Sequence, residues 1–159
     1  VMSPKSLLRH PLATSSLEEI ASGVFQNAIA EIDPIKPADV KRVVMCSGKV
    51  YYDLLEERRK RNITDIAIVR IEQLYPFPAQ EMDTIMKDYQ HVKDFVWCQE
   101  EPQNQGAWYC SQHHFWSSIP ATGKLTYAGR EASSSPAVGY LSVHNKQQQA
   151  LVNAALTIA

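Results

Sequence analysis

Polar side chains follow each of three short apolar segments, Val43–Cys46, Ile66–Val69 and Phe95–Cys98. Segments that are apolar at nearly every position are typical of strands buried on both faces of a parallel sheet. Ligands of open α/β sheets bind beyond the carboxyl ends of the strands, so the residues that leave these segments are the first ones to inspect. Together with positions further along the chain, the regulatory or interface candidates are Ser47, Gly48, Lys49, Arg70, Glu100, Glu101, Asn104, Gln105, Trp108 and Arg130.

The tripeptide Ser47-Gly48-Lys49 allows two interpretations. A helix that begins here would offer free backbone N–H groups and the positive end of its dipole to a phosphate. Alternatively, the tripeptide is a tight turn from strand to helix with Ser47 as the N-cap, and we favour this second interpretation. By itself the tripeptide matches neither the phosphate loop GxxxxGK[ST] nor the dinucleotide fingerprint GxGxxG.

Other residue types that could do chemistry give weaker signals. Neighbours on a strand point to opposite faces, so Glu100 and Glu101 are poorly placed to act as paired acid and base. We expect one of them to cap a helix or to pair with a basic group such as Arg70. Zinc needs a ligand beyond Cys110 and the His113–His114 pair, and interleaved aromatic residues favour a packed helix. No GxSxG elbow, the motif of a serine nucleophile, occurs. We therefore assign no catalytic residue, and for the reason given above we assign no metal ligand.

The elements that position these residues alternate between strand and helix. Apolar spacing predicts amphipathic helices over 49–61 and 79–89, a further helix from about residue 105, a strand over 124–128 and a final helix over 146–158. Ser16 and Glu19 fit a capping box at the start of a short helix. The alternation predicts right-handed βαβ units and a mainly parallel sheet covered on both faces.

Composition places the chain among ordinary soluble globular proteins. It has 159 residues, of which 45% are hydrophobic and 21% charged, with a net charge of −1. That balance gives no electrostatic reason to expect nucleic acid or an anionic membrane as a partner, and no run approaches the roughly 18 apolar residues of a membrane span. The three cysteines are far apart and odd in number, so we expect them to be reduced in a cytoplasmic location. Residues 1–14, with two prolines and no periodicity, predict an arm that arrives from a preceding domain, followed by one domain over 15–159.

Five long strings of sequence carry a resemblance to a known family. They are CSGKVYYDLLEERR (46–59), AIVRIEQLYPFP (67–78), VWCQEEPQNQGAWYCSQHH (96–114), YAGREASSSPAVG (127–139) and VHNKQQQALVNAAL (143–156). Together with SPKSLLRHPLATSSLEE (3–19), they resemble the end of the first, decarboxylating subunit of bacterial 2-oxoglutarate dehydrogenases. The resemblance implies the transketolase-type C-terminal fold: a three-layer α/β/α arrangement with a mostly parallel five-stranded sheet and one antiparallel strand.

The same resemblance implies a role inside a larger enzyme of the tricarboxylic acid cycle. In such enzymes 2-oxoglutarate is decarboxylated at thiamin diphosphate with Mg²⁺, and the succinyl group passes to a lipoyl group on the succinyltransferase component. The cofactor is held by a GDG motif with a downstream Asn pair, and this sequence contains neither. We therefore expect a domain that binds no cofactor, is inactive alone, and contacts the preceding domains and the second subunit of a homodimer.

Two other functions stay open. Some relatives bind acetyl-coenzyme A through adjacent arginines near the penultimate strand, where this chain has Arg130-Glu131, and the carboxylate would repel phosphates. A free-standing nucleotide or coenzyme A module that uses Ser47–Lys49, Arg70 and Arg130 is the alternative. An independent small enzyme built on Glu100, Glu101 and the two histidines is a third. Of the aromatic residues Trp108, Tyr109, Phe115 and Trp116, we expect at least part to lie at a docking surface.

Overall fold

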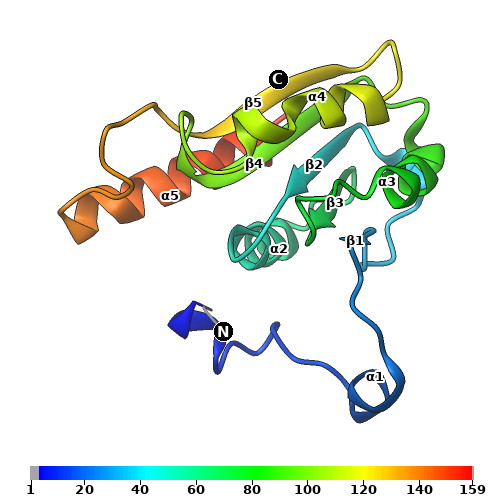
Figure 1. Cartoon of the computed structure of the whole chain (residues 1–159), viewed down its shortest axis with the longest axis horizontal. Coiled ribbons are helices and arrows are strands. Elements are labelled where there is room, and N and C mark those ends of the chain that lie inside the picture. The colour runs from blue at the N-terminus through cyan, green and yellow to red at the C-terminus, as the bar shows by residue number, and fades with distance from the viewer. Residues whose placement is uncertain (1–3, 159) are drawn as a thin grey trace.

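A five-stranded sheet forms the centre of the chain, in the order β1-β3-β2-β4-β5 (Figure 1). The computed structural model describes residues 4–158. The strands are β1 (Ala28–Ile29), β2 (Arg42–Cys46), β3 (Ile66–Ile71), β4 (Asp94–Pro102) and β5 (Lys124–Arg130). Strand β1 runs antiparallel to β3, and the other neighbours are parallel. The mostly parallel sheet with one antiparallel strand is therefore confirmed.

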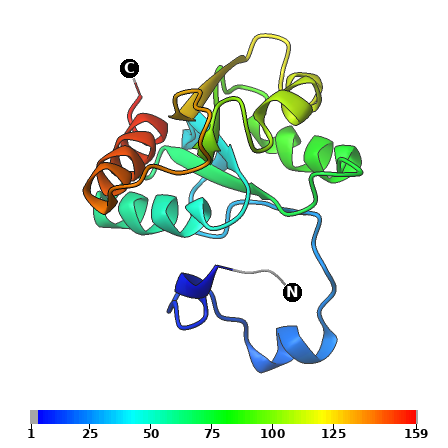
Figure 2. The same ribbon diagram turned by 60° about the vertical axis from the view of Figure 1, so that its left-hand side comes forward.

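Helices cover both faces of this sheet. The α-helices are α1 (Leu17–Ser22), α2 (Val50–Lys60), α3 (Ala79–Met86), α4 (Trp108–Ser118) and α5 (Leu141–Ala155), and the 3₁₀ turns are η1 (Lys5–Leu7), η2 (Pro37–Asp39) and η3 (Lys87–Tyr89). Helices α2 and α5 pack on one face and α3 and α4 on the other, as Figures 1 and 2 show. The three-layer architecture is as predicted, but the last helix runs over 141–155 rather than 146–158. Its first turn has no side-chain cap, and its apolar residues Leu141 and Val143 are exposed and lie two positions apart, so neither helical apolar spacing nor a capping residue marked its start.

The core is divided by the sheet into two apolar clusters. Val43 and Met45 of β2 point to the cluster under α3 and α4, whereas Val44 and Cys46 point to the cluster under α2 and α5. All five residues of β2 are buried. Burial on both faces is the reason that the central strands read as continuous apolar segments rather than as alternating ones.

Within the segment before β1, helix α1 stands apart from this body (Figures 1 and 2). The capping box is present: Ser16 Oγ accepts from the Glu19 backbone N–H (3.1 Å), and Glu19 Oε2 accepts from the Ser16 N–H (2.7 Å). Helix α1 nevertheless has no buried residue. Residues 1–3 of the expected arm and residue 159 of the expected domain lie outside the described residues. Among the described residues, the part of the chain that lies outside the body extends past residue 14 and includes α1.

A buried ion cluster fixes the chain where it leaves β1. Arg58 of α2, 1% exposed at its side chain, binds both carboxylate oxygens of Glu31 and also donates to Asp33 Oδ2 (2.8 Å) and the Ile66 carbonyl (2.9 Å). Glu31 Oε2 accepts a further bond from the backbone N–H of Ile68 (2.7 Å). The cluster thus joins the segment after β1 to both α2 and β3.

Candidate functional site

The carboxyl ends of β2 and β4 carry a polar network that we call the edge network, made of Lys49, Asp53, Glu100, Arg130 and Gln148. Lys49 Nζ lies 2.8 Å from Glu100 Oε1 and 3.4 Å from Asp53 Oδ2. Gln148 Nε2 of α5 donates to both carboxylates, to Asp53 Oδ2 at 2.8 Å and to Glu100 Oε1 at 3.0 Å. Burial lowers the pKa of Lys49, but the bond and charge of Glu100 outweigh it, and the pKa is raised above its usual value. The Lys49 ammonium group is therefore already paired with the carboxylates of Glu100 and Asp53.

Arg130, at the end of β5, completes the edge network. Its Nε donates to the Glu100 carbonyl (2.7 Å) and its Nη2 to Gln148 Oε1 (2.8 Å). Nη1 donates to Gln147, and Nη2 also lies 3.3 Å from His144 Nδ1. Each guanidinium nitrogen thus has a partner within the chain, and of the five N–H donors only the second one on Nη1 has no recorded partner among the described residues.

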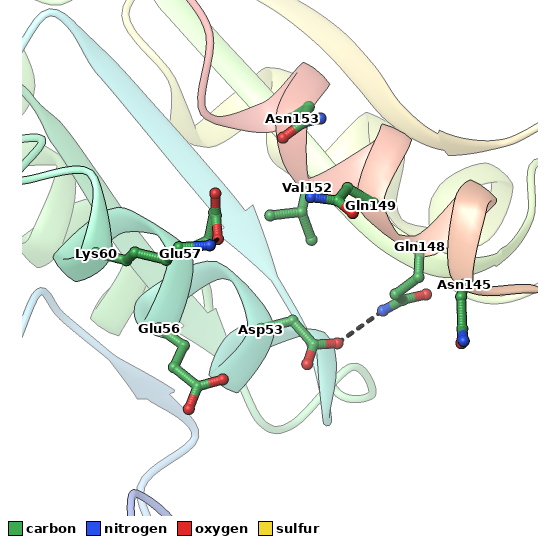
Figure 3. Close-up of a pocket in the computed structure, with 9 residues that line it drawn as sticks. All are labelled: Asp53, Glu56, Glu57, Lys60, Asn145, Gln148, Gln149, Val152 and Asn153. Atoms are coloured by element: carbon green, nitrogen blue, oxygen red, sulfur yellow. Dashed lines mark hydrogen bonds and ion pairs between the residues drawn. The ribbon is translucent and has the colours of Figure 1, made fainter.

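Helices α2 and α5 form a groove beside the edge network (Figure 3), with a volume of about 500 Å³. In Figure 3 the Asp53 and Gln148 side chains point toward each other across it and are joined by their hydrogen bond. The rest of the groove is lined by Glu56, Glu57 and Lys60 of α2 and by Asn145, Gln149, Val152 and Asn153 of α5. The lining combines carboxylates and amides with one lysine and one apolar residue, which suits contact between two helices at least as well as it suits a ligand.

Arg70 does not belong to the edge network. Glu100 does pair with a basic group, as expected, but that group is Lys49 rather than the Arg70 given as the example. In the strand order β3-β2-β4, strand β2 lies between the end of β3 and the end of β4, and Lys49 is the nearer base. Arg70 instead places its guanidinium carbon 4.2 Å from the centre of the Tyr51 ring and lies 3.9 Å from Glu72. The order of the strands could not be read from the sequence.

Ser47 is not the N-cap of α2, contrary to the favoured interpretation. The cap position falls on Lys49, with no side-chain hydrogen bond, and Gly48 between them has φ +74°. A left-handed residue at this point favours glycine and turns the chain from strand into helix without help from a hydroxyl. The structure does not support the alternative interpretation either. An anion site at this helix start would need the charge of Lys49, which is already paired with carboxylates.

Gln99 organises the loop that follows β4, and sequence reasoning did not single it out. Its Oε1 accepts from Trp97 Nε1 (2.9 Å) and from the Trp108 backbone N–H (3.0 Å), and its Nε2 donates to the Gln105 carbonyl (2.8 Å). The side chain is buried, 2% exposed. A lone Gln that directly continues an apolar strand segment was the available signal, since buried amides must find partners.

Asn104 and Gln105 bind the loop that follows β5, which contains Ser133. Asn104 Nδ2 donates to the Ser133 carbonyl (3.0 Å) while Asn104 Oδ1 accepts from the Ser133 N–H (2.9 Å), and Gln105 Nε2 reaches the same carbonyl (3.1 Å). This loop covers a cavity of about 580 Å³ whose lining includes Arg130, Glu131, Ser133 and Ser135. Both members of the Arg130-Glu131 pair therefore face one cavity.

Helix α4 divides its aromatic residues between core and surface. Trp108 and Phe115 are buried, whereas Tyr109 is 57% and Trp116 50% exposed. His114 stacks on Phe77 with ring centres 4.6 Å apart, which fits a packing role. Across residues 4–158, no group of three or more His, Cys, Asp and Glu side chains is arranged to hold a metal ion.

The cysteines offer no nucleophile in the core. Cys46 and Cys98 lie side by side on β2 and β4, and burial raises the pKa of Cys98 to about 12 and that of Cys46 well above its usual value. All three cysteines are free thiols. A buried thiol with a raised pKa carries too little thiolate at neutral pH to react.

Comparison with known proteins gives the family. A family model described as 2-oxoglutarate dehydrogenase C-terminal matches residues 14–156. The chain belongs to this family. It is 66% identical to the 2-oxoglutarate dehydrogenase E1 component of Haemophilus influenzae, over 98% of the chain, and 55% identical to that of Azotobacter vinelandii, over 99%. It is 48% identical to the oxoglutarate dehydrogenase of Buchnera aphidicola, over its whole length.

The family member described here spans only 17% of the length of each of these three relatives. One solved structure, the 2-oxoglutarate:ferredoxin oxidoreductase from Magnetococcus marinus with 2-oxoglutarate, coenzyme A and succinyl-CoA bound, matches with a TM-score of 0.46 and 9% identity, over 84% of this chain and 21% of that one. A likeness this weak bears on neither fold nor function. Within residues 4–158 no helix is both long and apolar enough to cross a membrane.

Proposed function

We propose that this chain is the C-terminal domain of a 2-oxoglutarate dehydrogenase E1 component, with a structural, dimer-supporting and regulatory role and no catalytic residue of its own. The observation that carries the proposal is the family match over 14–156 in a chain that covers 17% of its relatives. The proposed boundaries are an arm over 1–14 and the domain over 15–159. The whole E1 enzyme would decarboxylate 2-oxoglutarate and pass the succinyl group to the lipoyl group of its succinyltransferase partner in the cytoplasm.

The residues at the carboxyl edge do not fit thiamin diphosphate or its Mg²⁺. A diphosphate needs free donors or free positive charge, and Lys49 and Arg130 are both engaged by groups of the same chain. The metal needs a cluster of oxygen ligands, and the carboxylates Asp53 and Glu100 are already shared between Lys49 and Gln148. We therefore propose no catalytic step for this domain, and place the cofactor on the rest of the E1 polypeptide.

The outer face of α4 supports a docking role for the domain. No Asp, Glu, Lys or Arg occurs between Gly106 and Gly123, although the helix in this stretch exposes Tyr109 and Trp116. Helix α2, on the opposite face, exposes the charged residues Glu56, Arg59 and Lys60. Depletion of charge with enrichment of aromatic residues distinguishes the buried centre of an interface from ordinary surface. We propose that the preceding domains of the E1 subunit cover α4.

Calorimetric titration of the 159-residue chain with Mg²⁺-thiamin diphosphate tests the proposal. We expect no heat of binding, and no release of carbon dioxide from 2-oxoglutarate. Stoichiometric cofactor binding would overturn it. A full-length E1 polypeptide that ends in this sequence is the positive control, and it should bind the cofactor and decarboxylate 2-oxoglutarate.

A second candidate function is a nucleotide or coenzyme A site in the cavity beside Arg130. The observation that favours it is the 580 Å³ cavity lined by a guanidinium and by Ser133 and Ser135. Glu131 in the same lining opposes it, because its carboxylate would repel phosphates. Titration with acetyl-coenzyme A and with AMP decides the matter: saturable binding that Arg130→Ala weakens supports the site, and absence of heat from both ligands rejects it.

A further inference from the structure

The segment before β1 comprises the proposed arm over 1–14 and the first residues of the proposed domain, and in this subsection we call this whole segment the arm. It presents apolar side chains that no other part of the described chain covers. Leu17 and Ile20 of α1 are 80% and 72% exposed, and Val24 and Phe25 directly after it are 84% and 71% exposed. We call these four residues the arm face. Large apolar side chains at such exposure, grouped within one short segment, mark a contact site rather than the scattered apolar residues of an ordinary surface.

The arm contacts the body both before and after α1, so the arm face lies between two segments that are anchored to the body. Before α1, His10 packs on Tyr52 of α2 with ring centres 5.3 Å apart, and Leu12 packs against the core cluster under α2 and α5. After α1, Asn27 Nδ2 donates to Glu81 Oε1 (2.8 Å), and β1 then pairs with β3. Figures 1 and 2 show α1 away from the sheet and from the other helices in both views.

The intrinsic stability of helix α1 is too low to explain why it forms. It has six residues, and isolated helices shorter than about 12–15 residues are marginal in water even with good sequences. Its capping box helps it to begin, but the apolar stripe that should stabilise it has no partner within residues 4–158. Another surface must therefore supply the packing.

We infer that the arm face docks into an apolar groove on the part of the E1 polypeptide that lies outside this chain. The inference rests on the proposed function. The E1 relatives extend far beyond the matched region, which is 17% of their length, so most of the polypeptide is available to cover the arm. A permanently apolar surface also suits a contact within one polypeptide better than a transient one, because transient interfaces keep ordinary surface polarity. The binding mode is an amphipathic helix in a groove.

Hydrogen exchange measured by mass spectrometry tests the inference. The exchange rates of the backbone amides of residues 20–25 are compared between the 159-residue chain and a full-length E1 polypeptide that ends in this sequence. We expect exchange at least about tenfold slower in the full-length polypeptide. The double variant Leu17→Ser with Ile20→Ser should abolish that protection, while Glu18→Gln on the same helix should keep it. Leu17 and Ile20 are not part of either core cluster, so the double variant should fold normally.

Three other outcomes overturn the inference. Equal exchange in the two proteins means that the outside polypeptide does not cover the arm. Protection in the 159-residue chain that rises with its concentration, together with a dimer in sedimentation, makes a second copy the occupant. Protection in that chain at every concentration means that the arm packs on its own body. Decarboxylation of 2-oxoglutarate by the full-length polypeptide is measured in parallel, so failure of the proposed function is seen separately.

Discussion

Replacing Glu31 by Gln should destabilise the domain strongly, because it removes the partner of a buried charge. The Arg58 guanidinium is 1% exposed, and Glu31 accepts from both of its terminal nitrogens and from the Ile68 N–H. Gln is nearly isosteric, but in either orientation its amide nitrogen points at donors rather than at acceptors. One or more buried donors then lose their acceptor, at about 1–3 kcal/mol each. Among residues 4–158, Asp33 would be the only carboxylate left in contact with Arg58.

These terms give an expected loss of about 3–5 kcal/mol in the free energy of unfolding, the range typical for a buried ion pair that loses one partner. With a urea slope of about 2 kcal/mol per M, the denaturation midpoint should fall by about 2 M. Urea titration followed by tryptophan fluorescence measures this. The matched control is Asp65→Asn, which removes a carboxylate paired with the exposed Lys41 and should cost at most about 1 kcal/mol.

Similar midpoints for Glu31→Gln and Asp65→Asn would refute the reasoning, because burial would then have no influence on the cost. The double variant Glu31→Leu with Arg58→Met checks the mechanism from the other side. Replacing both charges by apolar groups leaves no unpaired charge, because Asp33 keeps its pair with Arg59, but the Ile68 N–H still lacks its acceptor, so only part of the lost stability should return. A double variant as unstable as Glu31→Gln would show that the unpaired charge of Arg58 was not the cause of the loss.

Three further predictions concern other parts of the chain. The hydrogen bond from Arg59, together with Arg58, holds the pKa of Asp33 below its usual 3.8, so its contribution to stability is complete above that value and is lost as pH falls through the lower folded pKa. Asp33→Asn should therefore flatten the fall of the urea midpoint below about pH 4; an unchanged slope contradicts the assignment. Gln99→Leu should cost about 2–4 kcal/mol and shift tryptophan emission, since it removes the acceptor for two buried N–H groups; native emission and stability would argue against its organising role. Arg42 donates to the carbonyls of residues 154, 155 and 157, so Arg42→Met should speed amide exchange in the last turn of α5 without affecting α4, and equal exchange in both proteins would reject this capping role.

Local features of the fold were predictable because their causes are local. Apolar runs marked β2, β3 and β4, and apolar spacing marked α2 and α3 to within a few residues. The pair Ser16 and Glu19 marked the start of α1, since a capping box is formed by residues three apart. The start of α5 was missed, because its first turn has neither apolar spacing nor a capping side chain.

The candidate site was predictable in place but not in its pairings. The polar residues that follow the apolar segments of β2 and β4 do meet at one edge, since parallel strands end on the same side of a sheet. Lys49 rather than Arg70 became the partner of Glu100, a result that depends on β2 lying between β3 and β4. Gln148 of α5 joined the same network from far along the chain.

The sequence by itself therefore determined most of the elements, the sheet class and the family, because apolar period, capping residues and long specific strings are properties of neighbouring positions. The two-residue strand β1 is too short to leave such a pattern. Only the tertiary structure decided which charges neutralise one another, that Gln99 is buried as the organiser of a loop, and that the arm face is left uncovered. Those outcomes depend on strand order and on helix placement, which bring together residues such as Glu31 and Arg58. A local pattern specifies what each residue offers, and only packing specifies which partner it meets.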